Sequence, residues 1–143
     1  MLIKVSIENW MSFRDRVDFS MIATRERQHS ERVAYVPSHR LKILPIALLY
    51  GGNASGKSNF VKALGFARNL VVTVNQPDAV IPVDPFRLGD GEEHQPTRFT
   101  FEILTPEGIF EYGFSVTRQA VIEERLVRIG PTAEHALYHR TDR

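Results

Sequence analysis

The feature that most constrains this chain is the octapeptide GGNASGKS at residues 51–58. Gly51, Gly56, Lys57 and Ser58 occupy the fixed positions of the pattern G-x-x-x-x-G-K-S, in which a loop joins a buried strand to a helix. Glycine tolerates the backbone conformations that let such a loop turn back on itself, so that its amides converge on one concavity. The octapeptide therefore predicts a loop that cradles phosphate groups, rather than a glycine-rich turn that binds nothing.

Both flanks of the octapeptide have the pattern that such a loop requires. The apolar run at residues 42–51 predicts a strand that is buried on both faces, and Pro45 lies near its start, where a missing amide donor is tolerated. Apolar side chains then recur at helical spacing from residue 57 to about residue 74 and predict an amphipathic helix. The apolar positions of this helix are Val61, Leu64, Phe66, Ala67, Leu70 and Val74.

The loop residues have expected roles in holding a nucleoside triphosphate. The backbone amides from about Asn53 to Ser58 are expected to donate hydrogen bonds to the phosphates, and the positive end of the following helix favours the same negative charge. Lys57 is expected to bridge the β- and γ-phosphates, while the Ser58 hydroxyl is the expected Mg²⁺ ligand. The complete set of expected binding residues is Gly51, Gly52, Asn53, Ala54, Ser55, Gly56, Lys57, Ser58 and Asn59.

Alternating apolar and polar residues predict two antiparallel strands within residues 1–23. In the first strand, Ile3, Val5 and Ile7 are expected to share one face, with the residues between them on the other face. Residues 24–40 are polar and arginine-rich, which indicates an irregular or partly helical connection to the apolar run before the loop.

The second half of the chain predicts a β-lobe. Residues 75–96 contain four of the eight prolines and are expected to form a long connection, with a short edge strand as an option. Three alternating segments predict an antiparallel meander over residues 97–129, and residues 135–140 offer one further strand. Together with the strand, loop and helix of residues 42–75, these segments predict an α/β fold with a mixed sheet and an antiparallel meander.

Length, charge and composition restrict the class of protein. A chain of 143 residues fits one ordinary domain, and its 18 basic and 17 acidic residues give a net charge of +1, which provides no global argument for a nucleic-acid partner. The absence of cysteine excludes disulfides and thiolate chemistry. Because charged residues are spread along the whole chain, we predict no signal peptide or membrane-spanning segment and expect a cytoplasmic protein.

Two motifs resemble one group of ATPases. GGNASGKSN, at residues 51–59, resembles the G-x-N-[GA]-[SA]-G-K-S-N loop of the ABC-type ATPase heads of SMC proteins, RecF-like repair ATPases and the OLD-like and AAA-labelled ATPases of bacterial defence systems. IENWMSF, at residues 7–13, resembles the I-x-N-[FW]-x-S-F segment with which these heads begin. The segments DPFRL, FEYGFSV, IEERL and LYHR are similar to the β-lobe of the same group.

The resemblance implies the N-terminal lobe of a P-loop NTPase, with residues 1–143 as a single and incomplete ABC-type head. It also implies ATP and Mg²⁺ as cofactors, a head-to-head dimer in the complete protein, and DNA or a nuclease as a partner. In the resembling heads the region before the loop lies near the nucleotide, which makes Arg14 and Arg32 candidate contacts. The sequence has no guanine-reading N-K-x-D segment, which agrees with ATP.

Two parts of an ABC-type ATPase are missing from the sequence: an apolar strand that ends in Asp-Glu, and an L-S-x-G-E-like signature. Prolines interrupt the apolar run before Asp84, and no glutamate follows it. Glu123 and Glu124 lie in the predicted meander, where a solvated face is the better interpretation. We therefore assign no catalytic residue and expect an ATPase only when segments from outside this chain complete it.

Other side chains are weaker candidates. His135 and His139 are four residues apart, but no third zinc ligand is near, and surface positions are the simpler interpretation. The arginines of residues 24–40 indicate a solvated connection, with phosphate contact as the alternative. Trp10 and Phe13 are expected to pack in the core or at a strand end rather than stack on a base.

Two alternative functions stay open at this point. A non-catalytic module that senses ATP would use the same loop without the missing segments. A P-loop kinase would also use the loop, but it expects the loop within its first few residues and a lid after it. This chain instead places two predicted strands and a long connection before the loop.

Overall fold

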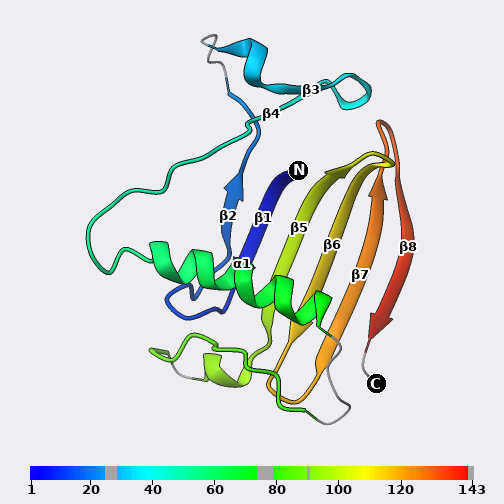
Figure 1. The fold of residues 1–143 in the computed structure, drawn as a ribbon. Helices are drawn as coiled ribbons and strands as arrows, with labels where there is room; N and C mark the ends of the chain where they lie inside the picture. Colours follow the sequence, from blue (N-terminus) through cyan, green and yellow to red (C-terminus); the bar gives the residue numbers. More distant parts are fainter. Residues whose placement is uncertain (25–28, 74–78, 90, 142–143) are drawn as a thin grey trace.

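The computed structural model describes residues 1–24, 29–73, 79–89 and 91–141. Within them, one α-helix lies across one face of a six-stranded antiparallel sheet with the strand order β2-β1-β5-β6-β7-β8 (Figure 1). The helix, α1, spans Lys57–Val72. The strands of the sheet are β1 (Leu2–Glu8), β2 (Val17–Ser20), β5 (Thr97–Thr105), β6 (Gly108–Val116), β7 (Val121–Ile129) and β8 (Glu134–Thr141).

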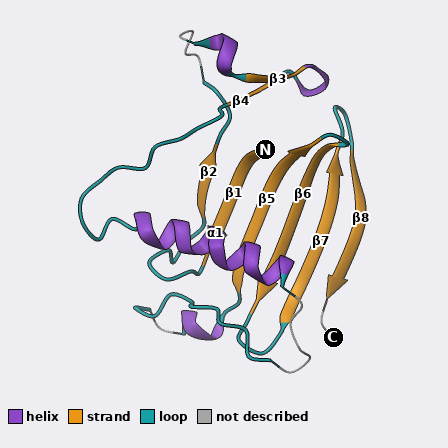
Figure 2. Cartoon of the chain, in the orientation of Figure 1, coloured by secondary structure: helices purple, strands orange, loops and turns teal. Residues whose placement is uncertain are grey.

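Smaller elements lie outside this sheet (Figure 2). They include the strands β3 (Ala34–Val36) and β4 (Leu41–Ile43) and the 3-10 helices η1 (Ser30–Arg32), η2 (Pro37–His39) and η3 (Glu92–His94). β3 and β4 form an antiparallel hairpin, and Ile43 packs with Ile3 and Ile109 of the main sheet in a small core cluster. The connection predicted over residues 24–40 to be irregular or partly helical therefore contains two short 3-10 helices, and it also contains the first strand of this hairpin.

The antiparallel strands predicted from alternation are present. β1 pairs with β2, the strands β5, β6 and β7 form the meander, and β8 is the further strand. The buried residues Val5, Phe99 and Phe114 of three different strands belong to one core cluster, which α1 covers. A sheet with one covered face needs apolar residues at every second position, which is why alternation identified these strands.

The predicted faces of β1 are wrong at the start of the strand. Val5 and Ile7 pack in the core with α1, but Ile3 belongs to the second cluster, and Leu2 packs against the first. The pairing of β1 with β5 shifts register between Leu2 and Lys4, so a bulge reverses the alternation there. β1 thereby contributes to both core clusters.

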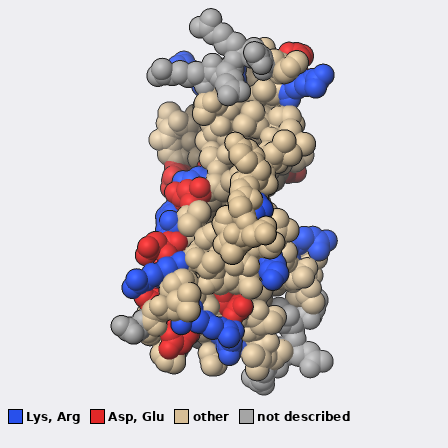
Figure 3. Space-filling model, turned by 90° about the vertical axis from the view of Figure 1, so that its left-hand side faces the viewer, with Lys and Arg blue, Asp and Glu red and all other residues tan. Residues whose placement is uncertain are grey.

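The strand predicted over residues 42–51 is formed only at its first two residues, as the end of β4. β4 ends at Ile43, and the chain then runs outside the sheet as a long irregular segment that leads to α1 (Figure 1). Ile46, Leu48 and Tyr50 are 70%, 81% and 93% exposed, and Figure 3, which views this side of the molecule, shows a broad area without charged side chains. A strand needs a neighbour for its backbone groups, and no described strand lies beside this segment.

The predicted mixed sheet is wrong for the same reason. Every strand pair in the described ranges is antiparallel. The parallel pairs expected of an α/β sheet depended on the strand before the loop, which has no partner here. The chain is still an α/β structure, because a helix packs on a sheet.

The helix predicted from residue 57 is present and ends at Val72, while Val74 lies outside the described residues. Its buried residues are Phe60, Ala63 and Ala67. Val61, which the periodicity placed on the apolar face, is 61% exposed. The predicted Leu64, Phe66 and Leu70 do pack against the core cluster, so the contact face differs from the prediction mainly at its start, where Phe60 and Ala63 are buried instead of Val61.

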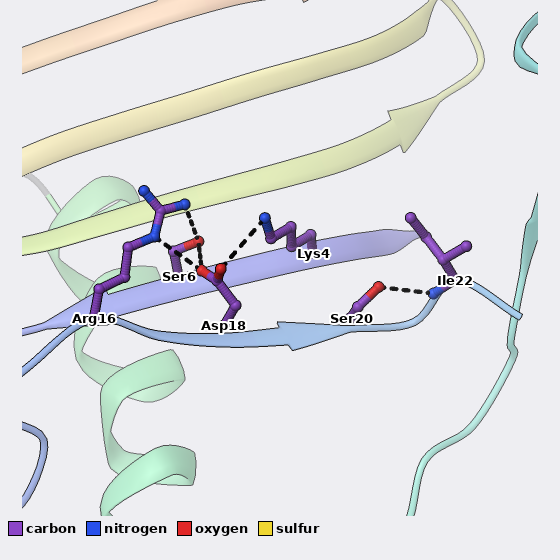
Figure 4. A network of polar contacts seen from close by, with 6 residues as sticks. All are labelled: Lys4, Ser6, Arg16, Asp18, Ser20 and Ile22. Carbon is purple, nitrogen blue, oxygen red and sulfur yellow. Dashed lines mark hydrogen bonds and ion pairs between the residues drawn. The ribbon is translucent and has the colours of Figure 1, made fainter. Parts of the chain in front are cut away.

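The opposite face of the sheet carries pairs of unlike charge. Lys4 and Arg16 lie 3.6 and 3.0 Å from carboxylate oxygens of Asp18, and Ser6 Oγ donates to the same carboxylate at 2.5 Å (Figure 4). Further pairs across this face are Arg98–Glu8, Arg125–Glu111 and His139–Glu123. Because acids and bases alternate, this face gives no local argument for a polyanionic partner.

β8 is an edge strand, and all of its residues are exposed. Its register against β7 shifts between Leu126 and Val127, where Tyr138 and Ala136 are the respective partners and Leu137 is left over. Neighbouring residues of β7 face opposite sides, so Ala136 and Tyr138 also face opposite sides although they are two residues apart.

Candidate phosphate-binding loop

The loop at residues 51–56 bends sharply into the helix. Gly56 directly precedes α1 and has φ +90°, a left-handed conformation that L side chains rarely adopt. Ala54 has φ +61° although it is not glycine, whereas Gly52 is outside the residues with positive φ. Position 56 is therefore where the loop depends most on glycine.

The start of α1 presents free backbone donors. The first helical hydrogen bond runs from Phe60 N to Gly56 O, so the amides of residues 57–59 have no partner within the helix. No side chain caps this end, and the first turn contains no acidic residue. Both features leave the positive end of the helix dipole open to an anion.

Lys57 folds back onto the loop. Its ammonium donates to Gly51 O at 2.8 Å, to Gly52 O at 2.6 Å and to Ser55 Oγ at 3.2 Å. The neighbouring Ser58 is exposed in the first turn of the helix. An ammonium and a free hydroxyl beside open amides fit a phosphate with its Mg²⁺, and Lys57 has to leave the carbonyl oxygens in order to contact a phosphate.

A hollow of about 200 Å³ lies over the loop and is lined by residues 54–59. A larger hollow of about 580 Å³ is lined by parts of residues 83–97 and 116–119 and shares no residue with the loop. The smaller hollow is the candidate site, because its walls supply convergent amides, a lysine and a serine. The greater volume of the other hollow does not by itself indicate a ligand.

The turn between β1 and β2 contacts the helix side of the loop. Trp10 Nε1 donates to Asn59 O at 3.0 Å, and Asn59 Nδ2 donates to Ser12 Oγ at 3.0 Å. Atoms of Ser12 and Phe13 lie 3.3–3.4 Å from the place where a Cβ on Gly56 would stand. Asn59 was expected to contact nucleotide, and in this structure its side chain contacts the turn.

Asn9 fixes the other side of this turn, a role that the sequence did not predict. Its side chain is buried, its Nδ2 donates to Glu92 O and Gln95 O at 2.8 Å, and its Oδ1 accepts from Phe86 N at 3.0 Å. The signal in the sequence was an asparagine at a predicted turn, which agrees with its φ of +54°. Spacing along the chain contained no sign of its three partners.

The arginines proposed as nucleotide contacts are placed differently. Arg14 forms an ion pair with Glu92 at 2.5 Å, beside the turn. Arg32 belongs to η1, which Figure 1 places away from the start of α1, and its guanidinium lies 3.8 Å from Glu31. The structure does not bring Arg32 to the loop. Arg25 and Arg27 lie outside the described residues.

The three carboxylates considered as catalytic acids have partners elsewhere. Asp84 forms an ion pair with Arg87, and Glu123 pairs with a histidine of β8. Glu124 accepts the Tyr112 hydroxyl at 2.5 Å, and burial together with this hydrogen bond raises the pKa of Tyr112, so the hydroxyl stays a donor at neutral pH. None of these contacts connects a carboxylate to the loop.

The described residues contain neither a cluster of metal ligands nor a helix that could span a membrane. His135 and His139 pair with Arg128 and Arg125 of β7, which puts the two histidines on opposite faces of the sheet. No group of three or more potential metal ligands occurs in the described ranges. In the same ranges, no helix has the length and apolar character needed to cross a bilayer.

The fold and the loop define a class first: an α/β protein in which a glycine-rich loop opens the helix that packs on the sheet. The chain belongs to the family described as "AAA domain, putative AbiEii toxin, Type IV TA system", whose model matches residues 46–143. The match includes the loop, α1 and the meander, and it confirms the predicted resemblance to AAA-labelled ATPases. No curated protein and no solved structure gives a match.

Proposed function

We propose that this chain is the ATP-binding N-terminal portion of an ABC-type, SMC-like ATPase, with hydrolysis in the complete protein. Residues 51–59 hold the phosphates, Lys57 contacts the β- and γ-phosphate oxygens, and the Ser58 hydroxyl is a ligand of Mg²⁺. Membership of the AAA family supports an ATPase-like, nucleotide-binding function.

The observation that carries this proposal is the open helix start next to Lys57. Three backbone amides without helical partners, no acidic residue in the first turn, and an ammonium held only by loop oxygens all lie within one short segment. A phosphate group satisfies these donors together, because it is anionic and presents several oxygens.

The exposed apolar residues before the loop support the view that the head is incomplete. Large apolar side chains at residues 46–50 lie in solvent, and such surfaces are normally covered in a working protein. In the complete ATPase this segment becomes the buried strand, and the Asp-Glu strand and signature come from segments that this sequence lacks.

The biological setting belongs to the same proposal. By resemblance, two complete heads dimerise around ATP in the cytoplasm and control DNA or a nuclease, in repair or in defence against phage. The family description, which names a toxin of a toxin–antitoxin system, agrees with a defence role.

A non-catalytic ATP-sensing module is the second candidate. It is favoured by one observation: Asp84, Glu123 and Glu124 are all engaged in contacts away from the loop. Such a module would bind MgATP through the same loop, but it would not hydrolyse ATP even when the Asp-Glu strand and the signature segment of an ATPase are added. A kinase is less favoured, because two strands of the main sheet precede the loop.

The test is MgATP binding by residues 1–143, measured by calorimetry for the wild type and Lys57→Ala. We expect the variant to bind roughly 100-fold more weakly or worse, because charge-assisted hydrogen bonds to phosphate are lost. Lys62→Ala is the matched control, since this exposed lysine lies on the same helix and its removal changes the net charge equally.

Wild-type affinity in Lys57→Ala, or an equal loss in Lys62→Ala, would refute the loop assignment. ATP turnover by the wild-type chain that Lys57→Ala abolishes would contradict the division between binding here and hydrolysis in the complete protein.

A further inference from the structure

We infer that the β1–β2 turn, residues 9–14, positions the phosphate loop, and that Ser12 does so through Asn59 without touching nucleotide. The inference rests on the proposed ATP binding and concerns the same site. The sequence indicated a packing role for Trp10 and Phe13 and a nucleotide contact for Arg14, but no role for Ser12.

The turn itself is rigidly held. Trp10 and Phe13 exchange backbone hydrogen bonds of 2.9 and 2.7 Å, and Met11 N donates to Asp84 O at 2.8 Å. The buried side chain of Asn9 adds three hydrogen bonds to the connection before β5. A turn tied to the sheet and to a separate connection has a fixed position from which to orient another segment.

From this position the turn contacts the loop and helix at three points. Trp10 Nε1 donates to the carbonyl of Asn59, whose side-chain amide donates to Ser12 Oγ. The third point is Gly56, whose α-carbon faces Ser12 and the ring of Phe13 so closely that a Cβ would lie 3.3 Å from the ring. These contacts fix the direction in which the amides of the helix start point.

The other side of the loop gives no comparable support. In the described structure, residues 45–50 take part in no backbone hydrogen bond outside regular elements, and their apolar side chains are largely exposed. Lys57 contacts only oxygens of the loop itself. The position of the loop relative to the sheet is therefore set through the turn and α1.

The test compares Ser12→Ala with Ser12→Thr in residues 1–143. Ser12 is exposed, so Ser12→Ala should unfold in urea as the wild type does. We expect Ser12→Ala to bind MgATP roughly three- to tenfold more weakly, the effect of one lost hydrogen bond, and Ser12→Thr to restore the affinity because it keeps the hydroxyl. Ser20→Ala is the matched control, since Ser20 Oγ accepts from Ile22 N at the sheet edge (Figure 4).

A second measurement does not need nucleotide. Hydrogen exchange of the Phe60 amide, which donates to Gly56 O at 2.9 Å where the loop enters α1, should be faster in Ser12→Ala than in the wild type, Ser12→Thr and Ser20→Ala. If the wild type binds MgATP but Ser12→Ala matches it in affinity and in exchange, the positioning role is refuted and ATP binding stands. If the wild type binds no MgATP, the proposed function fails, and the exchange rates alone decide whether the turn orders the loop.

Discussion

Asp18 shows how neighbouring strands set the charge state of one side chain. The hydrogen bond from Ser6 and then the one from Arg16 hold the pKa of Asp18 at about 2, with smaller contributions from the charges of Arg16 and Lys4. The side chain is 46% exposed, so solvent screens these interactions and their effect on stability is modest.

Asp18→Asn should lower the free energy of unfolding by about 0.5–1 kcal/mol at pH 7. The pKa is lower in the folded state than in the unfolded chain, so the stabilisation is complete above about pH 4 and is lost as the pH falls toward 2. Urea unfolding at several pH values should therefore show the wild type and the variant converging in acid. Asp15→Asn, in the adjoining turn, is the control, and a gap of constant size down to pH 2 would contradict the prediction.

At the scale of single residues, the sequence did not predict contacts between residues that lie far apart in the chain. The roles expected of Lys57 and Ser58 came from a local pattern, and the structure places both at the helix start. The contacts of Asn9 join residues 77 to 86 positions apart, and no local pattern encodes such a distance. The same holds for Ser12 and Asn59, which are 47 positions apart.

Elements whose pattern reflects one covered face were predicted well. The strands of the meander and α1 are present because a half-buried element repeats its apolar residues with the period of its backbone. The detailed faces were less accurate. A bulge moved Ile3 to another cluster, and Phe60 and Ala63, which were not among the predicted apolar positions of the helix, are buried beside the predicted Ala67.

Ala63→Leu should destabilise the chain by about 1–3 kcal/mol, because Ala63 is fully buried between α1 and the sheet and a larger side chain forces them apart. Val61→Leu, on the exposed side of the same helix, should stay within about 0.5 kcal/mol of the wild type. Urea unfolding followed by circular dichroism measures both. Equal stability of the two variants would mean that α1 does not pack through Ala63.

At the scale of the whole molecule, the apolar residues 46–50 are exposed and do not pair with the main sheet. The sequence predicted a strand over residues 42–51 because a continuous apolar run is typical of a strand covered on both faces. Such a run identifies the kind of surroundings that a segment needs, but not whether the same chain supplies them. In the described ranges, the six strands of the main sheet pair with one another and none of them pairs with residues 44–51.

Leu48→Ser combined with Leu49→Ser should leave the free energy of unfolding within about 1 kcal/mol of the wild type, since surface substitutions have small effects. It should also reduce dye binding and self-association, because less apolar surface stays in water. Ile7→Ala is the contrasting control: because Ile7 is buried in the core, this substitution should lower the free energy of unfolding by about 2–5 kcal/mol. A double variant as unstable as Ile7→Ala would show that residues 48 and 49 are packed.

The register shift at Leu137 has a consequence for crowded solutions. A long open edge is a template on which further copies add strand by strand, as in fibrils. The bulge at Leu137 reverses which β8 side chains face each side of the sheet. A regular strand from another copy can therefore match the side chains of β8 on one side of Leu137 but not on the other, so its pairing stops after a few residues. At the opposite edge β2 offers only four residues. Both edge strands of the sheet thus disfavour polymerisation by strand addition, although the exposed apolar residues 46–50 lie elsewhere on the same molecule.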